Sequence, residues 1–262
     1  MKRASEYRRL ARFSMGGQLG TMAASGFMQI LIYNLVGVIV AVLAAIGLIG
    51  IAALTVGWAT SLGGAGIISI FLVIMISVLV IAASAFIWLL KMGIVYQAGK
   101  AVYEQNVSIS DMFAVFKISR AWKLMVIGLM HMAIMLFFWI PYAVVLVITE
   151  PFTSVASTIA LTLSYLWLLV GNLVVFLLFG LSYYISLDQP QLGPVQCMKE
   201  NLVLTRKCKW KLLCLLFSFT GWYILVALTM GIGALWVQPY LYCTMYHFYE
   251  DLKIRKSALG IR

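Results

Sequence analysis

Residues 27–54 read FMQILIYNLVGVIVAVLAAIGLIGIAAL and contain no charged side chain. A helix needs about 20 consecutive apolar residues to cross the roughly 30 Å hydrocarbon core of a bilayer. This run is long enough to do so. The composition extends the conclusion to the whole chain, because 64% of its 262 residues are hydrophobic and 10% are charged. Soluble domains have about half and about a quarter, so we expect a single integral membrane domain over residues 1–262.

Further apolar runs along the chain meet or nearly meet the same length. They cover residues 64–90, 124–148, 159–183, 212–229 and 232–248. We therefore predict an all-α, polytopic transmembrane helix bundle of about six spans in three hairpins. The last two spans share the short uncharged stretch between Lys211 and Glu250. A re-entrant loop packed against the other helices is the alternative there, and either version returns the chain to the same face.

Basic residues orient the predicted bundle, because short loops rich in Lys and Arg stay in the cytoplasm. All of them precede the first span, follow the sixth, or lie between spans two and three or four and five. The opposite face has only residues 55–63, residues 149–158 and the turn at Met230-Gly231, with Glu150 as its one charge. We expect both termini in the cytoplasm of a bacterial cell, with the chain in its inner membrane.

A basic amphipathic segment precedes each predicted hairpin and begins near Ala4, Ser110 or Gly193-Pro194. Helices of this kind lie in the interface of an anionic leaflet; a solvated cytoplasmic helix is the alternative. The segments divide the chain into units of about 1–90, 91–183 and 184–252, followed by a tail at 253–262. Residues expected at the lipid interface are basic or aromatic: Arg206, Lys207, Lys209, Trp210, Lys211, Trp122 and Lys123. Anionic membrane lipids are the expected partners, and a membrane protein is a further candidate.

His131 is the exceptional ionisable residue within a predicted span, and Met130 and Met132 flank it. Imidazole and thioether ligands suit Cu(I), so a soft-metal site is one hypothesis. Adaptable packing of Met-rich helices and a hydrogen bond from a neutral histidine are the ordinary interpretation. We therefore expect no metal and no cofactor.

Three other positions within predicted spans attract attention. Asn172 and Gln238 are polar groups at membrane depth, where hydrogen bonds between helices are their usual use. Pro239 lacks an amide hydrogen and predicts an irregular helix at Gln238-Pro239. Near the cytoplasmic end, His247, Glu250 and Asp251 share one helical face, and we interpret them as a solvated helix end.

Several function classes are disfavoured by what the sequence lacks. It has no phosphate-binding loop, nucleophile elbow, HExxH motif or paired intramembrane carboxylate. Its four cysteines form no CxxC motif and no metal-binding spacing. The positive charge is explained by membrane orientation, so nucleic acid is not an expected partner.

The carboxyl-terminal part carries a specific resemblance. Its motifs include Lys209-Trp210-Lys211, Ser218-Phe219-Thr220-Gly221-Trp222, Leu228-Thr229-Met230-Gly231-Ile232-Gly233, Pro239-Tyr240 and Phe248-Tyr249-Glu250-Asp251-Leu252. In these the chain resembles the bacterial integral membrane family catalogued as domain of unknown function 975. Arg206-Lys207-Cys208 stand where that family often has a glycine-containing turn. The resemblance implies a bacterial inner-membrane protein and supplies no catalytic residue.

These observations lead to a functional hypothesis with one alternative. We expect a non-catalytic module that assists assembly or envelope homeostasis through helix and lipid contacts. The alternative is a transporter or channel for a small or apolar substrate, favoured by the repeated hairpins. A water-accessible cavity lined by Asn172 or Gln238 would distinguish the transporter from the module.

Overall fold

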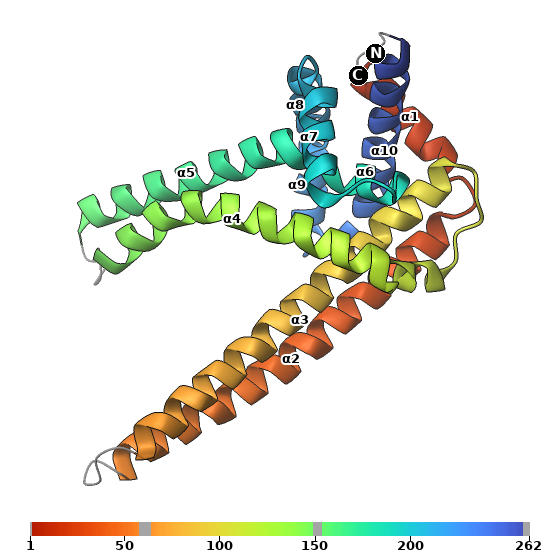
Figure 1. The fold of residues 1–262 in the computed structure, drawn as a ribbon. Helices are drawn as coiled ribbons and strands as arrows, with labels where there is room; N and C mark the ends of the chain where they lie inside the picture. The colour runs from red at the N-terminus through yellow and green to blue at the C-terminus, as the bar shows by residue number, and fades with distance from the viewer. Residues whose placement is uncertain (1, 58–63, 149–153, 259–262) are drawn as a thin grey trace.

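The computed structural model describes residues 2–57, 64–148 and 154–258, and every regular element in these ranges is a helix (Figure 1). The predicted all-α class is thus confirmed. The elements, in chain order, are α1 (Ala4–Ser14), α2 (Leu19–Gly57), α3 (Gly64–Val102), the 3-10 helix η1 (Ile109–Phe116), α4 (Ile118–Ile148), α5 (Val155–Phe179), α6 (Ser182–Asp188), α7 (Pro194–Thr205), α8 (Lys209–Phe217), α9 (Thr220–Leu228) and α10 (Ala234–Ala258). The turn predicted at 55–63 and the charge at Glu150 fall largely outside the described residues.

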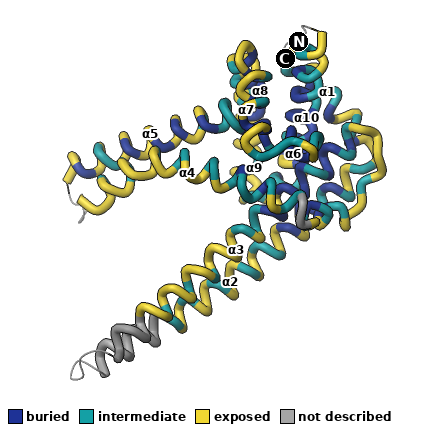
Figure 2. Tube along the Cα trace, in the orientation of Figure 1, coloured by how far each residue is buried: buried dark blue, intermediate teal, exposed yellow. Residues whose placement is uncertain are grey.

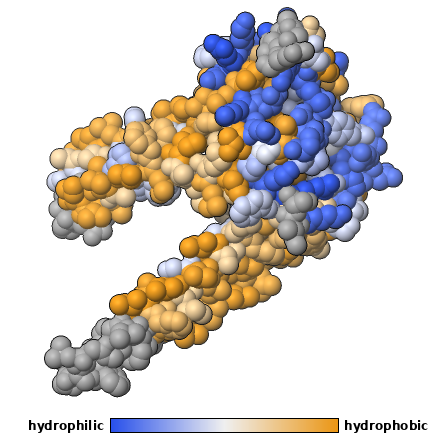
Figure 3. Space-filling model, viewed as in Figure 1, coloured by the Kyte–Doolittle hydropathy of each residue, from blue (hydrophilic) through white to orange (hydrophobic). Residues whose placement is uncertain are grey.

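Two long antiparallel hairpins project from a smaller head in different directions (Figure 1). One consists of α2 and α3, which have 39 residues each; at 1.5 Å per residue each is about 58 Å long. The other consists of α4 and α5. Side chains along both hairpins are apolar and largely uncovered (Figures 2 and 3), as Ile81 (67% exposed) and Val147 (75%) illustrate. Such a surface suggests a membrane protein, because apolar side chains are stable in lipid and costly to expose to water.

The protein core lies in the head, and α10 runs through its centre. Many α10 side chains are buried: Val237, Tyr240, Cys243, Met245, Tyr246, Phe248, Tyr249 and Leu252. The Tyr246 ring contacts Tyr103, Tyr184 and Tyr249 edge-on, with ring centroids 5.3–6.0 Å apart. Edge-on aromatic pairs add to the stabilisation from burial alone. The head therefore depends on the carboxyl-terminal helix.

The helices expected to rest on lipid place their apolar faces against protein. In α1 these residues are Tyr7 and Ala11, in η1 Met112 and Val115, and in α7 Cys197 and Met198. The Tyr7 ring lies 5.5 Å from that of Phe248. The stripe that predicted interfacial contact thus forms part of the head core, since periodicity does not distinguish a protein neighbour from lipid. Apolar side chains on other faces stay exposed, Phe13 at 79% and Val203 at 44%.

The stretch predicted to hold the fifth and sixth spans is divided. α8 ends at Phe217, α9 at Leu228, and an irregular turn precedes α10. Gly231 adopts φ +92° in that turn, a conformation that glycine adopts without steric cost. Five helical segments among the described residues are long and apolar enough to cross a membrane: Leu19–Gly47, Ile70–Val102, Arg120–Ile148, Val155–Asp188 and Lys209–Leu228. α10, which contains the predicted sixth span, is not one of them.

Candidate functional site

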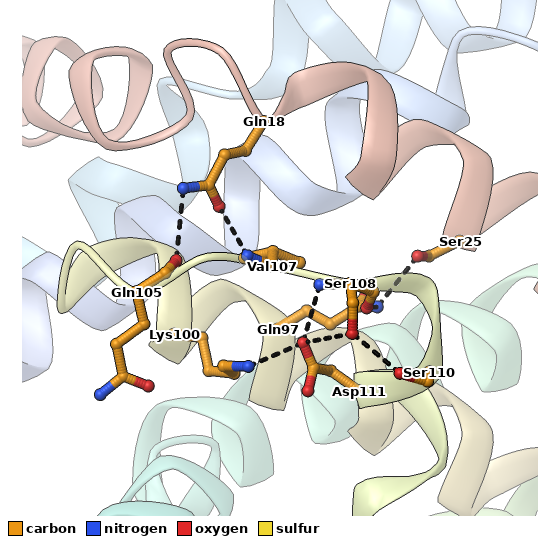
Figure 4. A network of polar contacts seen from close by, with 9 residues as sticks. All are labelled: Gln18, Ser25, Gln97, Lys100, Gln105, Val107, Ser108, Ser110 and Asp111. Carbon is orange, nitrogen blue, oxygen red and sulfur yellow. Dashed lines mark hydrogen bonds and ion pairs between the residues drawn. The ribbon is translucent and has the colours of Figure 1, made fainter.

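A polar network fastens the base of the first hairpin (Figure 4). The Gln18 amide donates to the Gln105 carbonyl and accepts from the Val107 amide, both at 3.2 Å. In the interior, the Gln97 amide donates to Ser25 Oγ and to the Ser108 carbonyl, both at 2.9 Å. These bonds hold the start of α2, the end of α3 and residues 105–108 together, so this part of the network is structural.

Asp111 joins η1 to α3 within the same network. Lys100 Nζ lies 2.8 Å from its carboxylate, and the Ser108 amide donates to it at 2.8 Å. Burial alone would raise the pKa of Asp111, but the hydrogen bonds from Lys100 and Ser108 outweigh it and hold the pKa below its ordinary value. The carboxylate therefore stays ionised at neutral pH and stabilises the short helix.

A second polar centre surrounds Asp188, at the end of α6. Its carboxylate accepts hydrogen bonds from Tyr103 Oη at 2.8 Å, Tyr249 Oη at 2.9 Å and Lys253 Nζ at 2.8 Å. Glu250 also accepts from Tyr103. Burial, followed by these carboxylates, raises the pKa of Tyr103 and of Tyr249. Both phenols therefore remain protonated donors, and the Asp188 centre links α3, α6 and α10.

A basic pocket of about 260 Å³ lies between the carboxyl-terminal ends of α7 and α10. Its cationic side chains come from two distant segments: Arg206, Lys207, Arg255 and Lys256. Apolar atoms of Val203, Leu204 and Leu252 also line it. Lys256 pairs with Glu200 at 2.7 Å, and the Arg255 guanidinium donates to the Cys208 sulfur at 3.0 Å. Within the described residues, Arg206 and Lys207 have no carboxylate partner.

Local sequence explains how α7 shapes this pocket. As predicted, the helix begins at Gly193 and Pro194, where proline supplies a suitable φ and lacks only an unused amide hydrogen. Buried Asn201 donates to the Leu178 carbonyl at 3.0 Å and fixes α7 to α5. The helix ends at Thr205, and the following turn directs Arg206 and Lys207 outward.

The other predicted interfacial residues lie at two places on the head. Trp210 and Lys211 are exposed on α8, Trp210 at 74%, while Lys209 is half-buried. Trp122 is 65% exposed at the start of α4, beside Lys123, which donates to the Pro190 carbonyl. Neither group lines the basic pocket. Exposed tryptophan beside lysine is typical of a surface that contacts the membrane interface.

The soft-metal hypothesis gains nothing from the geometry. His131 stacks on Tyr183 with centroids 5.1 Å apart, and its Nδ1 lies 2.9 Å from Tyr183 Oη. Met130 is half-buried, whereas Met132 is 62% exposed. His131 thus joins α4 to the chain after α5 through an ordinary hydrogen bond. Within the described residues, no group of three or more His, Cys, Asp or Glu side chains could hold a metal ion.

Asn172, Gln238 and Pro239 occupy unremarkable positions. Asn172 is exposed and donates to the Leu168 carbonyl of its own helix at 3.1 Å. Gln238 is exposed and Pro239 is buried. The predicted irregularity at Gln238-Pro239 lies elsewhere, since α10 is continuous from Ala234 to Ala258 and the helix is interrupted before it. Pro239 is the sixth residue of α10, so its missing amide hydrogen removes one helical bond, to the Leu235 carbonyl, and the helix continues past it.

The three residues expected on one solvated face have three separate partners. His247 Nε2 lies 2.9 Å from Ser14 Oγ, and Asp251 accepts from Tyr7 Oη at 2.6 Å. Glu250 belongs to the Asp188 centre. Sequence reasoning missed Asp188 and the pocket residues Arg255 and Lys256, because their partners lie far away along the chain. The one signal in the sequence was the position of Asp188, a lone aspartate after an apolar run.

Comparison with known proteins agrees with the resemblance noted in the sequence. The model of a family described as "Protein of unknown function (DUF975)" matches residues 67–256. No curated protein and no solved structure matches the chain. The family match includes the Asp188 centre and the basic pocket, and it excludes α1 and α2.

Proposed function

The chain belongs to the DUF975 family, and from this membership and the geometry of the head we propose that it is a non-catalytic module of the bacterial inner membrane. In this proposal it assists assembly or envelope homeostasis through helix and lipid contacts. The observation that carries it is the division of the molecule into uncovered apolar hairpins and a polar head (Figure 3). Such a molecule holds a folded basic surface against the membrane.

Contacts within the head support an even number of membrane crossings in each segment that leaves the head and returns to it. Tyr7 bonds to Asp251, Gln18 to Gln105, and Lys256 to Glu200. Residues in direct contact lie on the same side of a membrane. The α2–α3 hairpin and the α4–α5 hairpin therefore each leave and re-enter on one face, and their basic ends favour the cytoplasmic face. Both termini lie there.

The α9–α10 turn is re-entrant in this proposal. Arg8 in α1 donates to the Ser218 carbonyl at 3.2 Å, which favours a position of the α8–α9 junction near the cytoplasmic surface. Lys209–Leu228 as a whole is long enough to cross, but with the α8–α9 junction at the surface only α9 enters the bilayer. Its nine residues extend about 13.5 Å, less than half of the roughly 30 Å core. Its tip exposes Leu228 at 77% and Met230 at 96%. The tip therefore enters the cytoplasmic leaflet without crossing it.

Thiol labelling in intact cells tests this topology. Cysteine replacing Thr60, between the first two predicted spans, should react with a membrane-impermeant maleimide added outside. Met230→Cys should be labelled no more than the parent protein, because its side chain faces the inner leaflet. Labelling of Met230→Cys comparable to Thr60→Cys would establish two further crossings, and an unreactive Thr60→Cys would contradict the hairpin arrangement.

The functional proposal is tested in a host strain that lacks the protein. We expect uptake of a membrane-impermeant dye under envelope stress to rise at least twofold and to return to normal with the wild-type chain. Trp122→Ala/Trp210→Ala, present at the wild-type level, should restore it incompletely because the head has lost the exposed tryptophans of its membrane-interface surface. Unchanged dye uptake would contradict the proposal, and solute flux through proteoliposomes would favour the transporter.

A further inference from the structure

The basic pocket between α7 and α10 combines two surfaces that recognise different parts of one ligand. Arg206 and Lys207 are exposed and have no carboxylate partner among the described residues, so their charges remain available to an anion. A guanidinium presents paired N–H donors that match a phosphate, and an ammonium adds a compact charge. Lys256 adds a third cation, although Glu200 shares it at 2.7 Å.

The apolar part of the pocket continues outside it. Val203 lines the pocket and is 44% exposed, and Leu202 beside it is 37% exposed. Exposed Lys199 lies on the same face of α7, one turn before Val203. An apolar strip therefore leads from the cationic rim to Val203 and Leu202, where Lys199 ends it. A simple phosphate ion would leave this strip without a use.

From this arrangement we propose that the pocket binds the phosphate group of an anionic amphiphile, with Arg206 and Lys207 on the phosphate and the apolar chain along Val203 and Leu202. The proposal names the lipid class for the module proposed above and rests on that function. The volume of about 260 Å³ is below the roughly 300–1,000 Å³ of pockets for drug-sized ligands. It suits a headgroup whose chain continues into the membrane.

Charge on neighbouring segments sharpens the assignment. Lys209 and Lys211 lie within five residues of Arg206 on the start of α8, but they do not line the pocket. If the head attracted lipid only through its net charge, these two lysines would matter as much as Arg206 and Lys207. If the pocket is a binding site, the affinity for the ligand depends on where the positive charges lie and not on their total number.

The test uses the full chain purified in detergent and a soluble, short-chain phosphatidic acid as the probe. Binding is measured by titration at fixed ionic strength. Arg206→Gln/Lys207→Gln should weaken binding at least tenfold, whereas Lys209→Gln/Lys211→Gln removes the same charge and should change it less than twofold. If both double variants weakened phosphatidic acid binding equally, surface charge would explain the effect and the proposed site would be overturned. Unchanged binding by the first pair would overturn it as well.

Two further probes separate the sources of the phosphate. Phosphatidylcholine with the same short chains should bind at least tenfold more weakly than phosphatidic acid, because its headgroup has no net charge. Inorganic phosphate should also bind at least tenfold more weakly, because it lacks the apolar chain. Inorganic phosphate binding as tightly as phosphatidic acid would overturn the amphiphile assignment. Since dye uptake and topology are measured without these probes, failure of the pocket leaves the functional proposal separately testable.

Discussion

Asp188→Ala is expected to lower the free energy of unfolding by about 3 kcal/mol, because it removes the shared acceptor of three donors. The side chain is 12% exposed and bonds to Tyr103, Tyr249 and Lys253 at 2.8–2.9 Å. Glu250 lies 3.5 Å from Lys253 and compensates only in part. Thermal unfolding of the purified protein in detergent measures the change.

Asp188→Asn is the matched control for that prediction. The amide keeps the shape and one acceptor oxygen while it removes the negative charge, so we expect a loss of about 1 kcal/mol. A variant Asp188→Ala that unfolds at the wild-type temperature would show that the aromatic packing around Tyr246 holds α3, α6 and α10 together without the carboxylate.

Gly93→Ala should be the most damaging single-methyl addition to the first hairpin. A Cβ at this position would lie 2.1 Å from the Met112 carbonyl oxygen and 2.9 Å from its carbonyl carbon. These are backbone atoms, so relief requires η1 to move away from α3. Overpacking of this kind costs about 1–3 kcal/mol. We expect that loss in thermal unfolding, together with faster proteolysis of residues 103–108, which η1 and the polar network hold in place.

Gly37→Ala provides the comparison for Gly93→Ala, because it adds the same methyl to a helix of the same hairpin. Among the described residues, no atom beyond the adjoining backbone of its own helix lies within 4 Å of a Cβ at Gly37. The variant should unfold at or slightly above the wild-type temperature, since alanine has the higher helix propensity. If both variants behaved alike, the close approach of η1 to α3 would not be important for stability.

The sequence predicted the helical class and the long apolar helices. Residues 27–54 and 64–90 became the outer parts of α2 and α3, and Gly193-Pro194 became the start of α7. Each of these depends on composition or on residues a few positions apart. The apolar length and the charge of a segment follow from its individual residues, and the start of a helix depends on one turn of chain.

Other predictions needed information that the sequence pattern does not contain. The stripe through Tyr7 and Ala11 is the same whether lipid or α10 covers it, and the structure places α10 there. Similarly, the apolar residues of α10 were interpreted as a sixth span, whereas many of them, such as Tyr240, Tyr246 and Phe248, became core. Periodicity reports that a face is apolar and does not report what contacts it.

What the sequence by itself determined is therefore which segments are apolar and which are charged, because hydrophobic transfer free energy and charge are properties of the residues themselves. Only the tertiary structure decided which residues form sites. Asp188 meets Tyr103 and Tyr249 across 85 and 61 residues of chain, and Lys256 meets Glu200 across 56. Such contacts depend on how whole helices pack, so the Asp188 centre and the basic pocket follow from the position of α10 in the head.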